Sequence, residues 1–311
     1  MHYMIAVDGG GTKTRTVLFG EDGKVIFELM APGSNPLDVG VEEARRRLVT
    51  AMREAAEKSP GPISGIYAGV AGLYYFNDFF GQDMRGKFNC EHFRIETDGR
   101  NLISCELTKE ENGCCLIVGT GCGTWIRRKE KNIFTHTGGW GYMVDTAGSG
   151  YWLGREAVKA VCMAFDGRGK KTVLSELLAE KTGLPMPDCI PYLYDGGRAR
   201  FASLAHIVFD GSQEGDEVCN GIIEEGAERL AELIWTADRF FNEPYSVVMG
   251  GGIAENFPEY GELIRSKCPP RANVILAKRP PVFGAAVEAM HLCGLELPED
   301  FSENFLSSLN H

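Results

Sequence analysis

Short apolar runs alternate along the chain with glycine-rich turns and with longer segments of helical periodicity. The run Met4–Val7 predicts a buried strand, and the alternating segment Thr14–Phe19 predicts a second strand after a turn. The rest of the first third predicts a strand at Val25–Met30, a helix from Asp38 to about Lys58, a strand at Ser64–Val70, a helix near Asn77 to Lys87, a strand at Phe93–Glu96 and a helix from Gly99 to about Leu107.

The same pattern restarts after the polar break at Lys109–Gly113. Cys114–Val118 predicts a buried strand, and a second glycine-threonine turn leads to a returning strand at Trp125–Arg128. Each half therefore opens with strand, turn, strand, which indicates an internal repeat of organisation. The second half further predicts a strand at Ile133–His136, a helix opened by Gly148–Trp152, mainly helical structure over 172–241, strands at Tyr245–Met249 and Asn273–Ala277, a final helix after Pro280, and a loose tail after Pro298.

The first turn carries candidate chemistry in the stretch Asp8-Gly9-Gly10-Gly11-Thr12-Lys13-Thr14. We expect its glycines to adopt positive φ and to approach another group closely. Backbone N–H groups of such a turn can hold a phosphate, with Asp8 beside a phosphate-bound Mg²⁺. An ordinary tight hairpin explains the stretch equally well. A strand follows the turn where a helix would be needed, which excludes a Walker A loop and a dinucleotide fingerprint.

Composition and charge narrow the class of protein. The 311 residues suit two domains, and 44% apolar and 24% charged residues are ordinary for a globular protein. The net charge of −11 and the lack of a basic run argue against nucleic acid as a partner. No apolar stretch is long enough to span a membrane, and Met1-His2-Tyr3 leads directly into the first strand. We therefore expect a cytoplasmic protein.

The ten cysteines show no metal-binding pattern. No Cys-x-x-Cys pair occurs, Cys114 and Cys115 are adjacent inside an apolar run, and the histidines are scattered. We expect reduced cysteines that pack as small apolar side chains.

Three glycine turns that each follow a buried strand carry a family resemblance. The motifs are Asp8–Thr14, Ile117–Thr124 and Val248–Ala254, and Phe283–Val287 would be a linking helix. In this order they resemble the actin/Hsp70/sugar-kinase ATPase superfamily. Thr97-Asp98, Gly138-Gly139-Trp140-Gly141 and Ala147–Gly154 further resemble the N-acetylglucosamine kinase branch of the BadF/BadG/BcrA/BcrD-type ATPases.

The resemblance implies an α/β fold. It consists of duplicated ribonuclease H-like (actin-like ATPase) domains, each with a mixed five-stranded sheet, and an interdomain cleft. The N-terminal domain would comprise 1–113 plus 284–311, and the C-terminal domain 114–283 with a helical insertion at about 150–241.

The resemblance also implies an ATP-dependent kinase that phosphorylates a hydroxyl of an amino sugar, with ATP and Mg²⁺. Asp98 would be the catalytic base and Asp8 would hold Mg²⁺ through water. ATP and its phosphates would be bound by Gly9, Gly10, Gly11, Thr12, Lys13, Thr120, Gly121, Gly250, Gly251 and Gly252. The sugar would be bound by Asn35, Asp98, Thr120, Gly139, Trp140, Asp145 and Thr146. The resemblance allows a homodimer.

Simpler roles exist for three of these residues. Asp98 precedes a helix, where Asp usually acts as an N-cap. Asn35 lies in a turn-forming loop before Pro36, and Trp140 could be core filler.

The chain departs from the family pattern at one sugar-binding position. The family usually has Gly-Asp-Glu-Gly-Ser before the Tyr-Trp helix, with its Asp on sugar hydroxyls. Here Thr146 stands at that position and Asp145 one place earlier. Asp145 could replace the missing acid, or it could be a solvated loop residue with Thr146 as filler.

Two other functions remain open. An ATP-driven activator of a radical dehydratase or reductase would hold an iron–sulfur cluster through cysteine, and Cys122 lies within the second turn but off the pattern of those proteins. A non-catalytic sugar sensor would be expected to lack Asp98 or a phosphate turn, and this chain has both. The sugar kinase is the preferred hypothesis.

Overall fold

The computed structural model describes residues 1–76, 80, 84–131 and 133–309, and they form two compact units. Unit 1 comprises Met1–Glu111 and Ala277–His311, and unit 2 comprises Asn112–Leu276. The chain thus passes between units after Glu111 and after Leu276, whereas the predicted domain boundaries follow residues 113 and 283. Most of the expected helix at Asn77–Lys87 lies outside the described residues.

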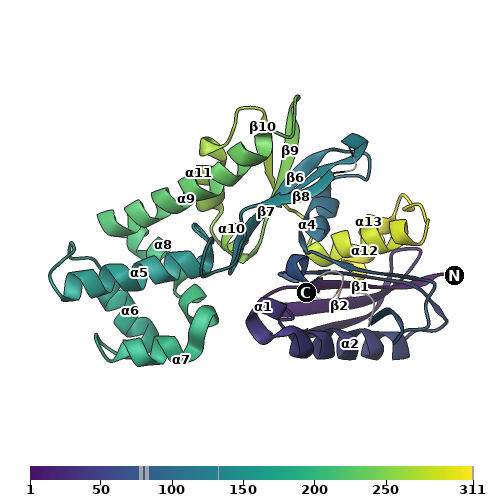
Figure 1. Cartoon of the computed structure of the whole chain (residues 1–311), viewed down its shortest axis with the longest axis horizontal. Coiled ribbons are helices and arrows are strands. Elements are labelled where there is room, and N and C mark those ends of the chain that lie inside the picture. The colour runs from purple at the N-terminus through teal and green to yellow at the C-terminus, as the bar shows by residue number, and fades with distance from the viewer. Residues whose placement is uncertain (77–79, 81–83, 132, 310–311) are drawn as a thin grey trace. The chain divides into compact units, whose positions relative to one another are not determined.

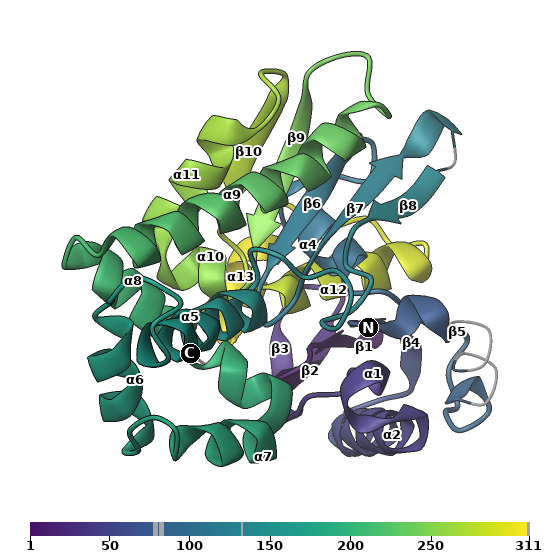
Figure 2. The same cartoon turned by 60° about the vertical axis from the view of Figure 1, so that its left-hand side comes forward.

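Unit 1 is built on a mixed five-stranded sheet in the order β3-β2-β1-β4-β5, of which Figure 1 labels β1 and β2 and Figure 2 labels all five strands. The first two neighbouring pairs are antiparallel, and β1, β4 and β5 run parallel. Met4 to Val7 are fully buried in the central strand, as the uninterrupted apolar run requires. The strands are β1 (Tyr3–Gly9), β2 (Lys13–Gly20), β3 (Val25–Pro32), β4 (Ile63–Val70) and β5 (His92–Glu96).

Helices cover both faces of this sheet. Ile5, Val7 and Leu18 pack on one face under α2 (Val41–Glu57). The predicted single helix from Asp38 is wrong, because Gly40 at φ +81° separates α2 from the short α1 (Pro36–Val39). The opposite face is covered by α4 (Gly99–Glu106), α12 (Pro281–Leu292) and α13 (Phe301–Ser308), and a short 3₁₀ helix spans Leu73–Tyr75.

The predicted loose tail is also wrong, because residues after Pro298 form α13. Phe301 and Phe305 are buried and lie edge-on to Phe19, with ring centroids 6.1 and 5.9 Å away. Phe283 of α12 lies 5.5 Å from Phe305. Phe301 and Phe305 are four residues apart in the sequence, which places their side chains on the same face of α13.

Unit 2 repeats the same sheet topology in the order β10-β9-β6-β7-β8 (Figure 2). Antiparallel β7 and β8 lie on one side of β6, and parallel β9 and β10 lie on the other. The strands are β6 (Gly113–Val118), β7 (Cys122–Arg128), β8 (Ile133–Thr137), β9 (Tyr245–Gly250) and β10 (Ala272–Leu276). The predicted α/β fold with two mixed five-stranded sheets is confirmed.

A group of helices lies between β8 and β9 in the sequence of unit 2. Asp216 caps the longest of them by accepting hydrogen bonds from the amides of Val218 and Cys219, both at 2.9 Å. The helices are α5 (Gly150–Phe165), α6 (Leu174–Thr182), α7 (Cys189–Ala202), α8 (Ala205–Gln213) and α9 (Glu217–Asp238). A 3₁₀ helix at Lys129–Lys131, α10 (Gly252–Asn256) and α11 (Pro258–Lys267) complete the unit.

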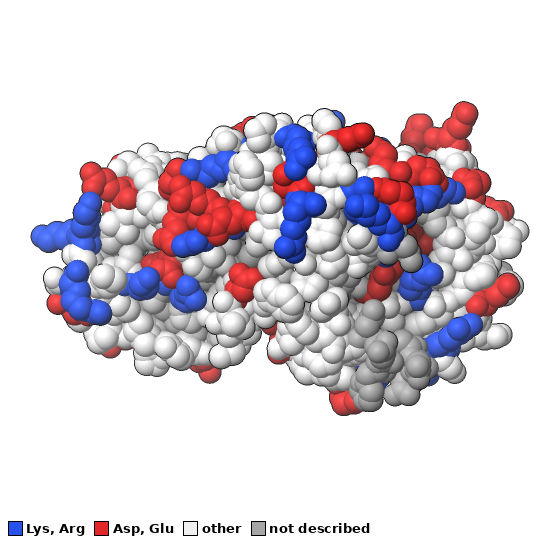
Figure 3. Space-filling model, turned by 45° about the horizontal axis from the view of Figure 1, so that its top comes forward, with Lys and Arg blue, Asp and Glu red and all other residues white. Residues whose placement is uncertain are grey.

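Surface charge is mixed on the face shown in Figure 3, where acidic and basic side chains are interspersed. Within the described ranges, every helix is too short or too polar to cross a membrane. All ten cysteines are free thiols, and Cys105, Cys114, Cys115, Cys189 and Cys219 are buried, as expected for small apolar residues.

Candidate active site

The carboxyl ends of β1, β4 and β5 bring the candidate catalytic groups of unit 1 together. Asp8 pairs in register with Gly69 of β4, and Gly69 pairs with Glu96 at the end of β5. Asp98 follows β5 directly and begins α4. The carboxyl edge of parallel strands is where open α/β sheets bind ligands.

The first glycine turn is held in place by backbone hydrogen bonds. The amide of Gly10 donates to the carbonyl of Lys13 at 2.8 Å, and the amide of Ser34 donates to the carbonyl of Gly10 at 3.0 Å. The expected positive φ is wrong for Gly9 and Gly10. A Cβ on Gly9 would lie 2.6 Å from Ser34 Oγ, so close approach explains the glycine at this position.

Asp98 has the properties expected of a side chain that transfers protons. It occupies the N-cap position of α4, yet its side chain makes no capping hydrogen bond. Desolvation, and then the charge of Asp8, raise the pKa of Asp98 to about 7, against a hydrogen bond from Thr97 Oγ1 at 3.2 Å. A carboxylate with a pKa near neutrality is suited to accept and release a proton.

Asn35 has a structural role. Its Oδ1 accepts a hydrogen bond from the amide of Leu37 at 2.9 Å and so caps α1. The residue is 6% exposed, and a Cβ on Gly72 would lie 2.1 Å from this oxygen. The turn role is therefore confirmed, and contact with a sugar stays a prediction.

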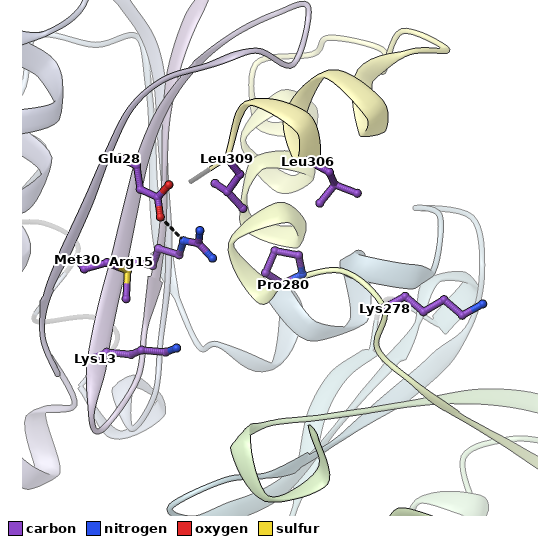
Figure 4. A pocket seen from close by; sticks show the side chains of 8 residues that line it. All are labelled: Lys13, Arg15, Glu28, Met30, Lys278, Pro280, Leu306 and Leu309. Carbon is purple, nitrogen blue, oxygen red and sulfur yellow. Dashed lines mark hydrogen bonds and ion pairs between the residues drawn. The ribbon is translucent and has the colours of Figure 1, made fainter. Parts of the chain in front are cut away.

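Lys13 points into a pocket of about 710 Å³ in unit 1 (Figure 4). Neither Lys13 nor Lys278 forms an ion pair within the described residues, whereas Arg15 pairs with Glu28 at 2.6 Å. The three cations outnumber the single acid, so the pocket favours anions. It is lined by Lys13, Arg15, Glu28, Met30, Lys278, Pro280, Leu306 and Leu309.

The second glycine turn, between β6 and β7 of unit 2, is fixed to the start of α5. The amides of Gly150 and Tyr151 donate to the carbonyls of Gly119 and Thr120 at 2.8 and 3.2 Å. A Cβ on Gly121 would lie 2.7 Å from a guanidinium nitrogen of Arg198. Thr120 and Gly121 thus lie beside an arginine from α7.

The Gly138-Gly139-Trp140 segment packs beside this turn. Gly139 adopts φ +73°, and a Cβ there would lie 2.9 Å from the carbonyl oxygen of Cys122. Trp140 is 51% exposed, and its ring lies 4.7 Å from that of His136. The core-filler interpretation of Trp140 is therefore wrong, and the ring is available to a ligand.

Asp145 and Thr146 differ in their environments. Asp145 is partly exposed and forms a backbone bridge with Gly141. Thr146 is buried, and its hydroxyl lies 2.7 Å from that of Ser149. Of the two, the Asp145 carboxylate has the greater access to a ligand in solution.

The third glycine turn joins β9 to α10. Gly251 adopts φ +109°, and a Cβ there would lie 2.8 Å from the carbonyl oxygen of Val118. Its amide donates to Glu255 Oε1 at 3.3 Å. Since β6 and β9 are parallel neighbours, the second and third turns lie at the same edge of the sheet of unit 2.

Sequence reasoning missed two polar residues at these turns. Asn101 donates a hydrogen bond to Asp8 Oδ1 at 2.9 Å, and the guanidinium of Arg198 lies 5.3 Å from the centre of the Tyr142 ring. The spacing of three residues from Asp98 could have indicated that Asn101 faces the same way. Arg198 lies in the helical insertion, where no sequence feature links it to Gly121.

Comparisons with known proteins cover nearly the whole chain. A model of the BadF/BadG/BcrA/BcrD ATPase family matches residues 5–289. The chain is 30% identical to an N-acetylmuramic acid/N-acetylglucosamine kinase of Clostridium acetobutylicum, over 94% of this chain and 100% of that protein. It is 27% identical to an N-acetyl-D-glucosamine kinase of Dictyostelium discoideum, over 92% and 97%.

Solved structures show the same fold. A Chromobacterium violaceum structure assigned as an N-acetylglucosamine kinase aligns with a TM-score of 0.74 at 22% identity. The alignment covers 94% of this chain and 99% of that one.

Proposed function

The chain belongs to the BadF/BadG/BcrA/BcrD ATPase family, and we propose that it is an ATP-dependent kinase that phosphorylates a hydroxyl of an amino sugar. N-acetylglucosamine, glucosamine and N-acetylmuramic acid are the candidate acceptors. The Clostridium acetobutylicum and Dictyostelium discoideum relatives carry kinase names for two of these sugars. The observation that carries the proposal is the Asp98 carboxylate, with its pKa of about 7, close to Asp8 and its glycine turn.

Asp98 acts as the general base. In its ionised form it accepts the proton of the sugar hydroxyl as that oxygen attacks the γ-phosphorus of ATP. The γ-phosphoryl group leaves ADP and forms the new P–O bond to the sugar. A base with a pKa near the working pH combines a usable ionised fraction with adequate basicity.

The first glycine turn holds the phosphates. The amide of Gly10 is already bonded to the carbonyl of Lys13, and the backbone fixed in this way would present the remaining amides of the turn without the cost of ordering a flexible loop. Lys13 adds a cation that has no ion-pair partner in the described part of the chain, which suits contact with a polyphosphate. For unit 2, phosphate contacts are proposed for Thr120 and Gly121, and adenosine contacts for Gly250, Gly251 and Gly252.

Asp8 fits a role at Mg²⁺. The described residues include no cluster of three or more acidic, histidine or cysteine side chains able to cage a metal ion. Mg²⁺ is commonly held by one or two carboxylates, phosphate oxygens and water, and so a single aspartate beside a phosphate turn is a suitable donor. When bound, Mg²⁺ would neutralise negative charge on the β- and γ-phosphates.

Sugar-binding roles are proposed for Asn35 and Asp98 in unit 1, and for Thr120, Gly139, Trp140, Asp145 and Thr146 in unit 2. The exposed Trp140 ring suits contact with the apolar face of a sugar ring. Asp145 offers a carboxylate for charge-assisted hydrogen bonds to hydroxyls.

Self-association of the chain stays a prediction, and light scattering on the purified protein would test it.

The activator alternative gains no support from Cys122. Its thiol donates to the carbonyl of Ala147 at 3.5 Å, and desolvation raises its pKa to about 12. A thiolate is the form that binds iron. Iron analysis of anaerobically purified protein should find the metal absent, and a stoichiometric cluster would favour the activator.

The central experiment is a coupled ADP-release assay over the three amino sugars, with phosphorus NMR of the products. We expect sugar-dependent ADP release and a new phosphomonoester signal. Asp98→Asn is the negative control. If the protein binds nucleotide but no amino sugar stimulates ADP release, the proposed kinase activity is wrong.

A further inference from the structure

The side chain of Asn101 contacts Asp8, one of the two candidate carboxylates of unit 1. Its Nδ2 lies 2.9 Å from Asp8 Oδ1 and 3.4 Å from the carbonyl oxygens of Val7 and Gly69. All three neighbours accept hydrogen bonds, so the amide nitrogen must face them. Asn101 is the third residue of α4, one turn after Asp98.

This arrangement is costly for the fold. Asn101 is fully buried, and its Oδ1 has no hydrogen-bond donor within the part of the chain that the structure describes. A buried unpaired acceptor lowers stability, and an apolar side chain would avoid this cost. An explanation is therefore needed for a polar residue here.

Gly69 is matched to the Asn101 side chain. A Cβ on Gly69 would lie 2.1 Å from Asn101 Oδ1 and 2.5 Å from its Nδ2. Any larger residue at position 69 would displace the amide from Asp8. The pair therefore determines where one oxygen of the Asp8 carboxylate is held.

We infer that Asn101 is a positioning residue that orients the Asp8 carboxylate toward the nucleotide-bound divalent cation. This inference rests on the proposed function, and it adds a residue that acts through Asp8 without touching the substrates. It also ties Asp8 to the helix that begins with Asp98, so the cation site and the base keep a fixed spacing. Partners of this kind typically change metal affinity by roughly 10- to 100-fold when removed.

The test measures metal binding directly. Free Mn²⁺ is followed by electron paramagnetic resonance as it is titrated into the whole protein with a non-hydrolysable ATP analogue. We expect Asn101→Ala to weaken Mn²⁺ binding by roughly tenfold or more. Affinity for N-acetylglucosamine should not change.

Ser104→Ala is the matched control. Ser104 lies one turn further along α4, is 5% exposed and bonds Glu288 at 2.5 Å, away from Asp8. A role of Asn101 in merely anchoring α4 predicts that both variants behave alike. The inference predicts that only Asn101→Ala loses Mn²⁺ affinity.

Gly69→Ala gives an independent route to the same result. Its methyl group should displace the Asn101 amide and weaken Mn²⁺ binding to a similar degree. In the double variant Asn101→Ala/Gly69→Ala the second change should add nothing, because both act through one contact. Gly69→Ala decides the question if Asn101→Ala fails to fold.

Wild-type Mn²⁺ affinity in a folded Asn101→Ala or Gly69→Ala protein would overturn the inference. Such a result would leave the kinase proposal intact, because that proposal depends on sugar-stimulated ADP release. If the wild-type protein binds no Mn²⁺ with the analogue, the inference is also wrong.

Discussion

Thr146 and Ser149 share a hydrogen bond of 2.7 Å between their hydroxyl oxygens at the start of α5. Ser149 in turn caps α5 by accepting from the amide of Trp152 at 3.3 Å. Thr146 is only 5% exposed. The position at which the family resemblance leads us to expect a sugar-binding acid therefore supports a helix end in this chain.

Asp145→Ala should raise the KM for the sugar by about one to two decades and leave the KM for ATP nearly unchanged. The expected cause is the loss of charge-assisted hydrogen bonds worth about 1.5–3 kcal/mol. Steady-state kinetics on the three amino sugars will measure this. Met143→Ala is the control, since Met143 lies in the same loop and is 82% exposed. Wild-type kinetics of Asp145→Ala on every sugar would remove Asp145 from the site.

Asp98→Asn should lower kcat by roughly 10²- to 10⁴-fold, the usual effect of losing a general base. The amide has nearly the same shape, so binding of ATP and sugar should persist. Calorimetric titration with ATP and with the sugar tests whether binding persists, and steady-state kinetics measure the loss of kcat. Near-normal turnover would show that another group takes the proton.

The pH dependence of kcat/KM for MgATP should show an acid limb near pH 7. Asp98 must be ionised to act as a base, and its pKa is raised to about 7, so activity falls as the pH decreases through that value. The hydrogen bond from Thr97 lowers this pKa. Thr97→Ala should therefore move the limb to higher pH. A limb that stays in place or moves down would contradict the assignment.

Trp140→Ala should weaken sugar binding by roughly tenfold or more without loss of stability. Surface substitutions usually change the free energy of unfolding by less than about 0.5 kcal/mol. Trp235→Ala on α9 is a matched control, because Trp235 is 53% exposed against 51% for Trp140. Fluorescence titration with sugar and thermal unfolding of both variants distinguish the outcomes. Equal sugar affinities in the two variants would exclude Trp140 from the sugar site.

Phe305→Ala should destabilise unit 1 by about 3–5 kcal/mol, the cost of removing a fully buried phenylalanine. Denaturant unfolding measures the change. Leu297→Ala, at a 38% exposed position shortly before α13, should have little effect. If both changes are equally mild, α13 contributes little to the fold.

The strands could be predicted because each is an uninterrupted or alternating apolar run. The Met4–Val7 and Cys114–Val118 runs carry this pattern in their own residues, and both strands are confirmed. The break at Gly40 and the helix α13 were missed. In α13 the buried phenylalanines become informative only once Phe19 and Phe283 are known to lie opposite them.

Sequence motifs name candidate residues for the site, but they do not predict the contacts among those residues. Gly9 is required by Ser34, which lies 25 positions further along, and not by its own backbone angle. The pKa of Asp98 depends on Asp8, which lies on a distant strand. Asn101 reaches Asp8 across 93 positions of sequence. Such contacts depend on strand order, which local patterns do not encode.

The division of unit 1 into two chain segments has a consequence for synthesis on the ribosome. Met4, Ala6, Val17 and Phe19 are translated before the Asn112–Leu276 segment, whereas α12 and α13, which cover them, are translated after it. The nascent chain must therefore carry an uncovered apolar sheet face while the continuous Asn112–Leu276 segment is made. That segment can complete its own core first, so the later half of the repeat would become native before the earlier half.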